Sequence, residues 1–171
     1  KLAAERYLAE NRPARSVVVL RPSLVYGPGD RGNMLPLIRQ ILNRRYFHIG
    51  QASARKSVIY AADLAHIIET ALEKAPAGFH IYNASNPTAP SVREIADAIV
   101  SAAELDGKIP TFPEVLVRAG SYASLALGNK SPLPPSRLDK LTKPATCSVG
   151  KLQALTGFEP KYTLHEGLKA E

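Results

Sequence analysis

Apolar residues follow two different periods along the chain. Residues 16–20 and 79–83 are short runs rich in valine or aromatic residues, which is typical of buried strands. In residues 61–74 and 91–103, apolar side chains recur every three to four positions, the spacing of amphipathic helices. Strands that alternate with helices in this way predict an α/β fold.

Shorter elements surround these four segments. Residues 1–10 consist largely of good helix formers, and an apolar stripe after Asn33 predicts a helix that Asn33 caps. Ser91 and Thr163 each begin a capping box. The other expected elements are strands over residues 47–50, 57–60 and 108–112, a helix over residues 114–127, a loop over residues 128–135 and a short helix that ends at Gly157.

A segment rich in proline and glycine separates the first strand from the Asn33 helix. We expect residues 21–30 to form a loop at the carboxyl end of that strand, where open α/β sheets bind ligands. Pro22 and Pro28 fix φ within it. Residues 27–32 match G-x-G-x-x-G, but no acidic residue follows at about 20 positions to hold a ribose hydroxyl, so a rigid turn is the better interpretation.

Composition narrows the class of protein. The chain has 171 residues, is 45% hydrophobic and contains no apolar run near the roughly 18 residues of a membrane span. No apolar leader opens it, and Cys147 is the only cysteine. We therefore expect a cytoplasmic protein without a disulfide. The four histidines show no metal-ligand spacing, so no metal is expected.

Positive charge is concentrated in one segment. The net charge is +7, and no acidic residue lies between Asp30 and Asp63. Such a segment is either a solvated basic face or a surface that meets phosphate. Only Tyr46 and Phe47 interleave with its basic residues, so binding of nucleic acid is the weaker interpretation. The basic residues are Arg31, Arg39, Arg44, Arg45, Arg55 and Lys56.

Five motifs occur in a fixed order over nearly the whole chain. Together they resemble the extended short-chain dehydrogenase/reductases, the NAD-dependent epimerase/dehydratase family. The motifs are Lys1-Leu2-Ala3-Ala4-Glu5, Arg21-Pro22-x-x-Val25-Tyr26-Gly27-Pro28-Gly29, Tyr60-x-x-Asp63-Leu64-Ala65, Tyr82-Asn83-Ala84 and Gly157-Phe158-Glu159-Pro160-Lys161-x-Thr163-Leu164-x-Glu166-Gly167-Leu168.

The resemblance implies a catalytic role for Lys1. In this family the lysine ammonium binds the nicotinamide ribose and lowers the pKa of a tyrosine one helical turn earlier, so that the phenol serves as general acid and base. That tyrosine would precede Lys1. None of the seven tyrosines of this chain has a lysine four residues later, so no other pair replaces it.

The resemblance also implies a cofactor site and a substrate site. Pro22, Ser23, Leu24 and Val25 would lie beside the nicotinamide of NAD or NADP. Substrate would contact Asn33 and Met34 at a helix start, which suits an anionic group, and also Arg55 and Lys56. Nucleotide-sugar enzymes of the family carry Arg-Asp-Phe where this chain has Lys56-Ser57-Val58, so a lysine would meet the diphosphate as a point charge.

The implied architecture is the C-terminal part of a Rossmann-type parallel sheet plus a small mixed α/β substrate-binding domain. Residues 1–32 and 57–84 would form the first, and residues 33–56 and 85–171 the second. The chain would then be the C-terminal half of an NAD(P)-dependent oxidoreductase or epimerase. By itself we expect it to be inactive.

The sequence is compatible with two classes of substrate and with two functions other than catalysis. The substrate would be a nucleotide sugar or a sterol-like secondary alcohol, and a homodimer is possible in this family. The alternative to an enzyme is a binding module without catalysis, either a NAD-sensing relative or a basic nucleic-acid-binding protein.

Overall fold

The computed structural model describes residues 1–11, 16–30, 32, 34–124 and 134–170. Its elements, in chain order, are α1 (Leu2–Asn11), β1 (Ser16–Pro22), β2 (Leu24–Tyr26), α2 (Met34–Leu42), β3 (His48–Ile49), β4 (Val58–Tyr60), α3 (Ala61–Lys74), β5 (Gly78–Ala84), α4 (Val92–Ala102), β6 (Thr111–Phe112), α5 (Glu114–Ala123), α6 (Pro135–Thr142), α7 (Gly150–Thr156) and α8 (Leu164–Lys169).

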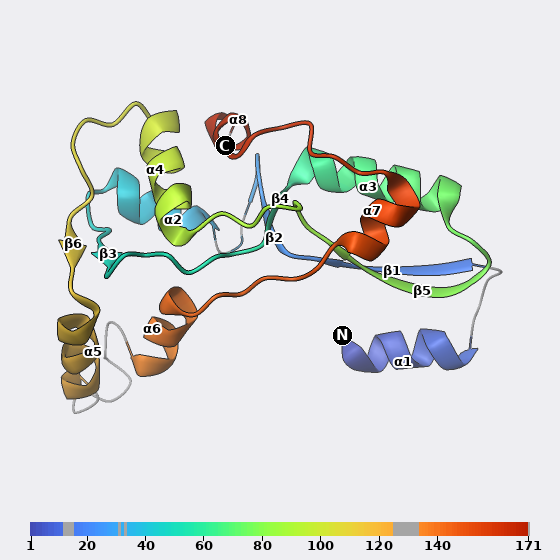
Figure 1. Cartoon of the computed structure of the whole chain (residues 1–171), viewed down its shortest axis with the longest axis horizontal. Helices are drawn as coiled ribbons and strands as arrows, with labels where there is room; N and C mark the ends of the chain where they lie inside the picture. Colours follow the sequence, from blue (N-terminus) through green and yellow to red (C-terminus); the bar gives the residue numbers. More distant parts are fainter. Residues whose placement is uncertain (12–15, 31, 33, 125–133, 171) are drawn as a thin grey trace.

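The strands form three parallel pairs, β1 with β5, β2 with β4 and β3 with β6 (Figure 1). The chain changes its partner strand at Ser23. The Ser23 amide donates to the Ala84 carbonyl of β5 at 2.9 Å, whereas the next amide, of Leu24, donates to Ser57 beside β4 at 3.3 Å. Pro22 has no N–H, so the ladder to β5 loses a donor next to this point.

Helices cover both faces of the β1–β5 pair. Figure 1 shows α3 and α7 on one side of the two strands and α1 on the other. The side toward α3 and α7 holds an apolar core, whereas α1 has no buried residue. The buried members of this apolar core are Ile59, Ile67, Tyr82, Ala84, Leu152 and Phe158.

A second apolar core lies among α2, α4 and α8. The capping box of Ser91 and Glu94 starts α4, and that of Thr163 and Glu166 starts α8, as the sequence predicts. The strands β2 and β4 contribute to this core as well. Its buried members are Tyr26, Met34, Ile41, Val58, Tyr60, Ile95, Ala96, Ile99 and Leu168.

The structure confirms the α/β fold class and most of the predicted elements. The helix predicted over residues 61–74 has those bounds. The loop predicted over residues 21–30 is wrong up to Tyr26 and right after it: β1 runs on to Pro22, and β2 follows after one residue, because backbone hydrogen bonds to β5 and then to β4 keep the chain extended. The two domain ranges predicted from the sequence remain a prediction.

Some predictions fall on residues outside the described part. These are Asn33, the last three residues of the helix predicted over 114–127, and most of the loop predicted over 128–135. The sequence pattern did not reveal α6. No helix in the described ranges is long and apolar enough to cross a membrane.

Gly27 closes the turn after β2 where a side chain has no room. Its φ is +135°, a conformation that L residues rarely adopt, and a Cβ there would lie 2.8 Å from the Tyr60 ring. The Asp30 amide donates to the Gly27 carbonyl at 2.9 Å. Gly29 also has a positive φ, +83°, but nothing lies within 4 Å of its Cβ position.

We predict that Gly27→Ala lowers the free energy of unfolding by about 1–3 kcal/mol, since it adds a steric clash to backbone strain. Gly29→Ala is the matched control because it carries the strain without the clash. Urea unfolding of both variants measures the difference. Equal losses in the two would contradict the role given to the Tyr60 contact.

Candidate functional site

The exchange of strand partners at Ser23 borders a large cavity. Its volume is about 1420 Å³, above the range of most small-molecule pockets, and residues of β1, β2, α2 and α6 line it. The carboxyl end of β1 lies here, where open parallel sheets bind ligands. The cavity is therefore our candidate site.

Four of the five residues that the sequence assigned to the cofactor line this cavity, namely Pro22, Ser23, Leu24 and Val25, and the fifth, Lys1, does not. The Ser23 Oγ is buried and has no hydrogen-bond partner within the described ranges. A buried hydroxyl without a partner costs free energy unless a ligand satisfies it. The residues present thus fit a polar ligand held against the end of β1.

Lys1 does not line the cavity, but its helix is attached to the cavity wall. The Arg21 Nε donates to a Glu5 carboxylate oxygen at 3.0 Å, with a second bond from its Nη2, and Arg21 lines the cavity. The Glu5 amide donates to the Lys1 carbonyl at 3.1 Å. Residues four apart share a helix face, so Lys1 lies one turn from the Arg21 ion pair.

The four residues predicted to contact substrate differ in whether they line the cavity. Met34 is fully buried and lines the cavity. Asn33 lies outside the described residues. Arg55 is not among the lining residues, and its Nη1 donates to the Ala89 carbonyl at 2.7 Å. Lys56 does line the cavity.

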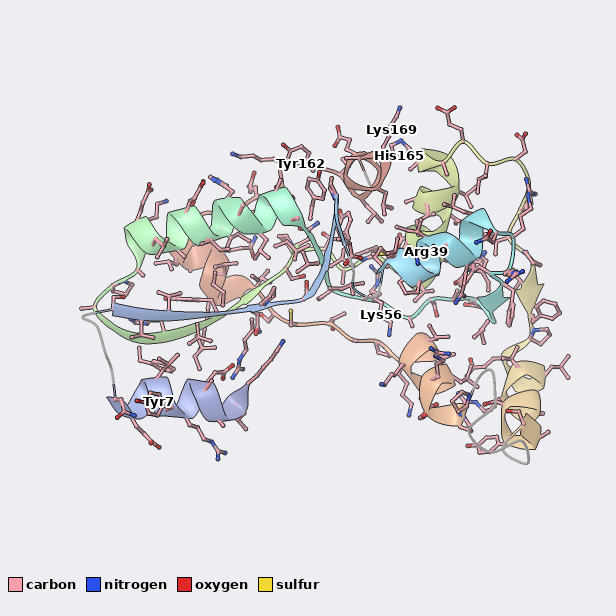
Figure 2. The ribbon with its side chains drawn as sticks, turned by 180° about the vertical axis from the view of Figure 1, so that it is seen from behind. Tyr7, Arg39, Lys56, Tyr162, His165 and Lys169 are labelled. Carbon is pink, nitrogen blue, oxygen red and sulfur yellow. The ribbon has the colours of Figure 1, made fainter. Side chains whose placement is uncertain are left out.

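Lys56 (labelled in Figure 2) holds the end of α6. Its Nζ donates to the carbonyls of Lys140 and Lys143, both at 2.7 Å. A cation at a helix C-terminus satisfies free carbonyls and interacts favourably with the helix dipole. Burial lowers the pKa of Lys56. The ammonium therefore fixes α6 against the cavity wall.

Three further cations line the cavity: Arg45 before β3, and Arg137 and Lys140 of α6. Their side chains form no hydrogen bond or ion pair with any other residue that the structure describes. The two acidic lining residues are already engaged. Asp30 accepts from the Leu35 amide at 3.2 Å, and Glu114 accepts from Arg118 at 2.7 Å.

The cavity is thus electropositive along α6. Sequence reasoning noted Arg45 as part of the basic segment but missed Arg137 and Lys140. The available signal was Pro135, since proline is favoured at the first position of a helix.

No lining tyrosine is suited to act as a base. Burial raises the pKa of Tyr46 to about 12, so its phenol stays protonated. Within the described ranges no three histidine, cysteine, aspartate or glutamate residues gather as a metal site. The lining can bind and orient a ligand through its cations, its phenol and Ser23.

The basic segment does not form one continuous phosphate-binding face. Arg44 donates to the Asp106 carbonyl at 3.1 Å, and Arg55 and Lys56 also donate to backbone carbonyls. Each of these three side chains thus forms a hydrogen bond to a segment that is distant in sequence. Arg31 lies outside the described residues, so of the remaining members only Arg45 and Lys56 line the cavity.

Residues 1–85 match the family model described as "NAD dependent epimerase/dehydratase family". The chain belongs to this family. Its matched part holds α1, β1 and β2, and residues of β1 and β2 line the cavity.

Two curated proteins and one solved structure illustrate the range of its relatives. The N-acetyl-alpha-D-glucosaminyl-diphospho-ditrans,octacis-undecaprenol 4-epimerase of Escherichia coli O157:H7 is 26% identical, over 90% of this chain and 47% of its own length. The 2-alkyl-3-oxoalkanoate reductase of Stenotrophomonas maltophilia is 28% identical, over 98% and 54%. The chain spans about half the length of these relatives.

The UDP-glucuronic acid 4-epimerase of Bacillus cereus, solved in complex with NAD, has the same fold. Its TM-score is 0.65 at 19% identity, over 97% of this chain and 46% of that one. This likeness confirms a Rossmann-type parallel architecture, and the aligned part of this chain includes residues beyond 85.

We predict that Lys56→Met lowers the free energy of unfolding by about 1–2 kcal/mol, since two carbonyls at the end of α6 lose a charged donor. Amide hydrogen exchange should accelerate in α6 more than in α3. Lys151→Met, a change of the same kind on the exposed side of α7, is the control. Unchanged exchange in α6 would contradict the anchoring role of Lys56.

Proposed function

We propose that the full-length protein is an NAD(P)-dependent enzyme of the epimerase type, which acts on a sugar attached to a diphosphate. The observation that carries this proposal is one cavity lined both by Ser23 with its unpartnered hydroxyl and by three unpaired cations. The Ser23 hydroxyl fits a cofactor beside β1. The three cations fit the phosphates of the substrate, which need positive charge at a distance from the reacting carbon.

The proposed cofactor site consists of Pro22, Ser23, Leu24 and Val25. A nicotinamide bound there would supply the acceptor for a hydride from a carbinol carbon. The Ser23 hydroxyl would donate or accept one hydrogen bond to the cofactor.

Lys1 is proposed to assist a tyrosine one helical turn earlier in the full-length protein. An ammonium nearby lowers the pKa of a phenol, so that the phenol can take a proton from the substrate hydroxyl. The ion pair of Arg21 with Glu5 supports this role because it fixes α1 beside the cavity. Residues 1–171 alone hold no tyrosine at the required spacing, and we propose that they are inactive by themselves.

The phosphates of the substrate are proposed to lie against α6. Arg137 offers a planar fork that binds phosphate oxygens in pairs, and Lys140 adds a point charge. Lys56 would support them through α6 and keep a third N–H for the ligand, since its ammonium has three donors and two are used.

An apolar hydroxy or oxo compound is the second candidate substrate. The similarity to a 2-alkyl-3-oxoalkanoate reductase favours it, as do the apolar lining residues Met34, Leu37 and Leu141. Such a substrate needs no pair of cations. The unpaired charges of α6 therefore favour the diphosphate-linked sugar.

We predict that the full-length enzyme interconverts UDP-glucose and UDP-galactose, or the N-acetylated pair, and that Lys1→Ala lowers kcat at least a hundredfold. The control Lys151→Ala removes a lysine that does not line the cavity. A coupled assay of product sugar, with 3-hydroxyalkanoates as competing substrates, measures both. Turnover of the alkanoates alone would replace the sugar proposal, and full activity of Lys1→Ala would refute the role of Lys1.

A further inference from the structure

One buried histidine contacts a tyrosine of the cavity wall. His48 lies in β3, is 1% accessible to solvent and does not line the cavity, whereas Tyr46, two residues earlier, does line it. The hydroxyl of Tyr46 lies 3.5 Å from the Nδ1 of His48. The two rings meet edge to face, with centroids 5.4 Å apart and an interplanar angle of 87°. The hydroxyl of a cavity-lining residue is therefore within reach of a buried imidazole.

The other ring nitrogen of His48 faces α4. Its Nε2 lies 3.8 Å from the Oδ1 of Asp97 and has no hydrogen-bond partner in the described part of the chain. The side chain of Asp97 is 61% exposed, so its carboxylate stays solvated and charged at neutral pH. An N–H that points at a carboxylate is favoured over a lone pair that does so, because the lone pair is repelled. The neutral imidazole is therefore expected to carry its proton on Nε2.

This tautomer decides how Tyr46 forms its hydrogen bonds. With the proton on Nε2, the Nδ1 of His48 is an acceptor, and Tyr46 donates its hydroxyl proton to it. The phenol oxygen then offers only lone pairs to the cavity. When His48 takes up a second proton, Nδ1 becomes a donor to the phenol oxygen, and the hydroxyl proton of Tyr46 is free for an acceptor in the cavity. Burial raises the pKa of Tyr46 to about 12, so the phenol itself keeps its proton in both states.

We infer that His48 and Asp97 are positioning residues that set whether Tyr46 accepts or donates a hydrogen bond at the cavity wall. With neutral His48, Tyr46 accepts from an N–H or O–H group in the cavity. With protonated His48, Tyr46 donates to an oxygen there, such as that of a phosphate. The inference goes beyond the proposed function and rests on it only where the ligand is taken to be a diphosphate.

The groups around His48 determine the pH at which the direction reverses. Burial and the positive charge of Arg93, in α4, lower the pKa of His48, whereas the carboxylate of Asp97 raises it. The phenol of Tyr46 stays neutral, and β6, the strand paired with β3, adds no titratable side chain. The net change in the pKa of His48 is downward, so His48 is neutral near pH 7 and becomes protonated only below about pH 6.5.

NMR of the histidine rings in the full-length protein tests the inference without a ligand, because protonated and unprotonated ring nitrogens differ in chemical shift. The variant Tyr46→Phe removes only a hydroxyl, and Asp97→Asn removes only a charge at an exposed position. Glu69→Gln is the matched control, since Glu69 lies 3.9 Å from the Nδ1 of His66 in an exposed pair on α3.

We expect the Nε2–H tautomer of His48 at neutral pH. Tyr46→Phe should change the chemical shift of the His48 Nδ1, Asp97→Asn should lower the midpoint of the His48 titration, and Glu69→Gln should change the signals of His66 alone. The inference would be overturned by an Nδ1–H tautomer, by an Nδ1 shift that is the same with and without the Tyr46 hydroxyl, or by a His48 that stays neutral until acid unfolds the protein.

Binding of UDP separates this inference from the proposed function. The affinity for UDP is measured below and above the titration midpoint of His48, and the ratio of the two values should be about threefold larger in the unmodified protein than in Tyr46→Phe, the effect of one neutral hydrogen bond. Equal ratios would overturn the inference. If UDP does not bind at all, the proposed diphosphate site fails, and the spectra of the free protein still decide on His48.

Discussion

The structure depends on one change of hydrogen-bond partner. Up to Ser23 the first strand pairs with β5, and from Leu24 on it pairs with β4. Parallel strands that diverge leave a crevice at their carboxyl ends, which the sheet itself cannot fill. The cavity begins at this point, and both apolar cores are built outward from the same strands.

Charged side chains contribute much of what positions the cavity wall that α6 forms. Leu138 is the buried residue of α6, and the helix is fastened at its end by Lys56 and at its side by the Arg118–Asp139 ion pair. Such bonds are directional, so they set the position of α6 relative to the cavity. The side chains of Arg137 and Lys140 have no partner among the described residues and are therefore available to a ligand.

The sequence allowed prediction of what depends on local pattern. The helix of residues 61–74, the two capping boxes and the strand after residue 15 follow from periodicity and cap chemistry, which act over a few residues. Pro22 to Val25 could be assigned to the cavity because a motif marked them.

What depends on contacts distant in sequence could not be predicted. The strand β2 was missed because its partner lies more than thirty residues later, and prolines and glycines around it suggested a loop. The helix α6 has a weakly apolar sequence and is secured by Lys56, 84 residues before Lys140. For the same reason, the sequence did not indicate that Arg137 and Lys140 of this helix line the cavity.

We propose that a cofactor binds at β1–β2 and a diphosphate at α6, within the same cavity. Hydrogen exchange of the full-length protein, measured with NAD alone, with UDP alone and with both, tests it most directly. We predict that NAD protects the amides of residues 23–25 and that UDP protects those of residues 137–141. Protection of neither segment by its ligand, or protection confined to surfaces away from the cavity, would contradict the claim.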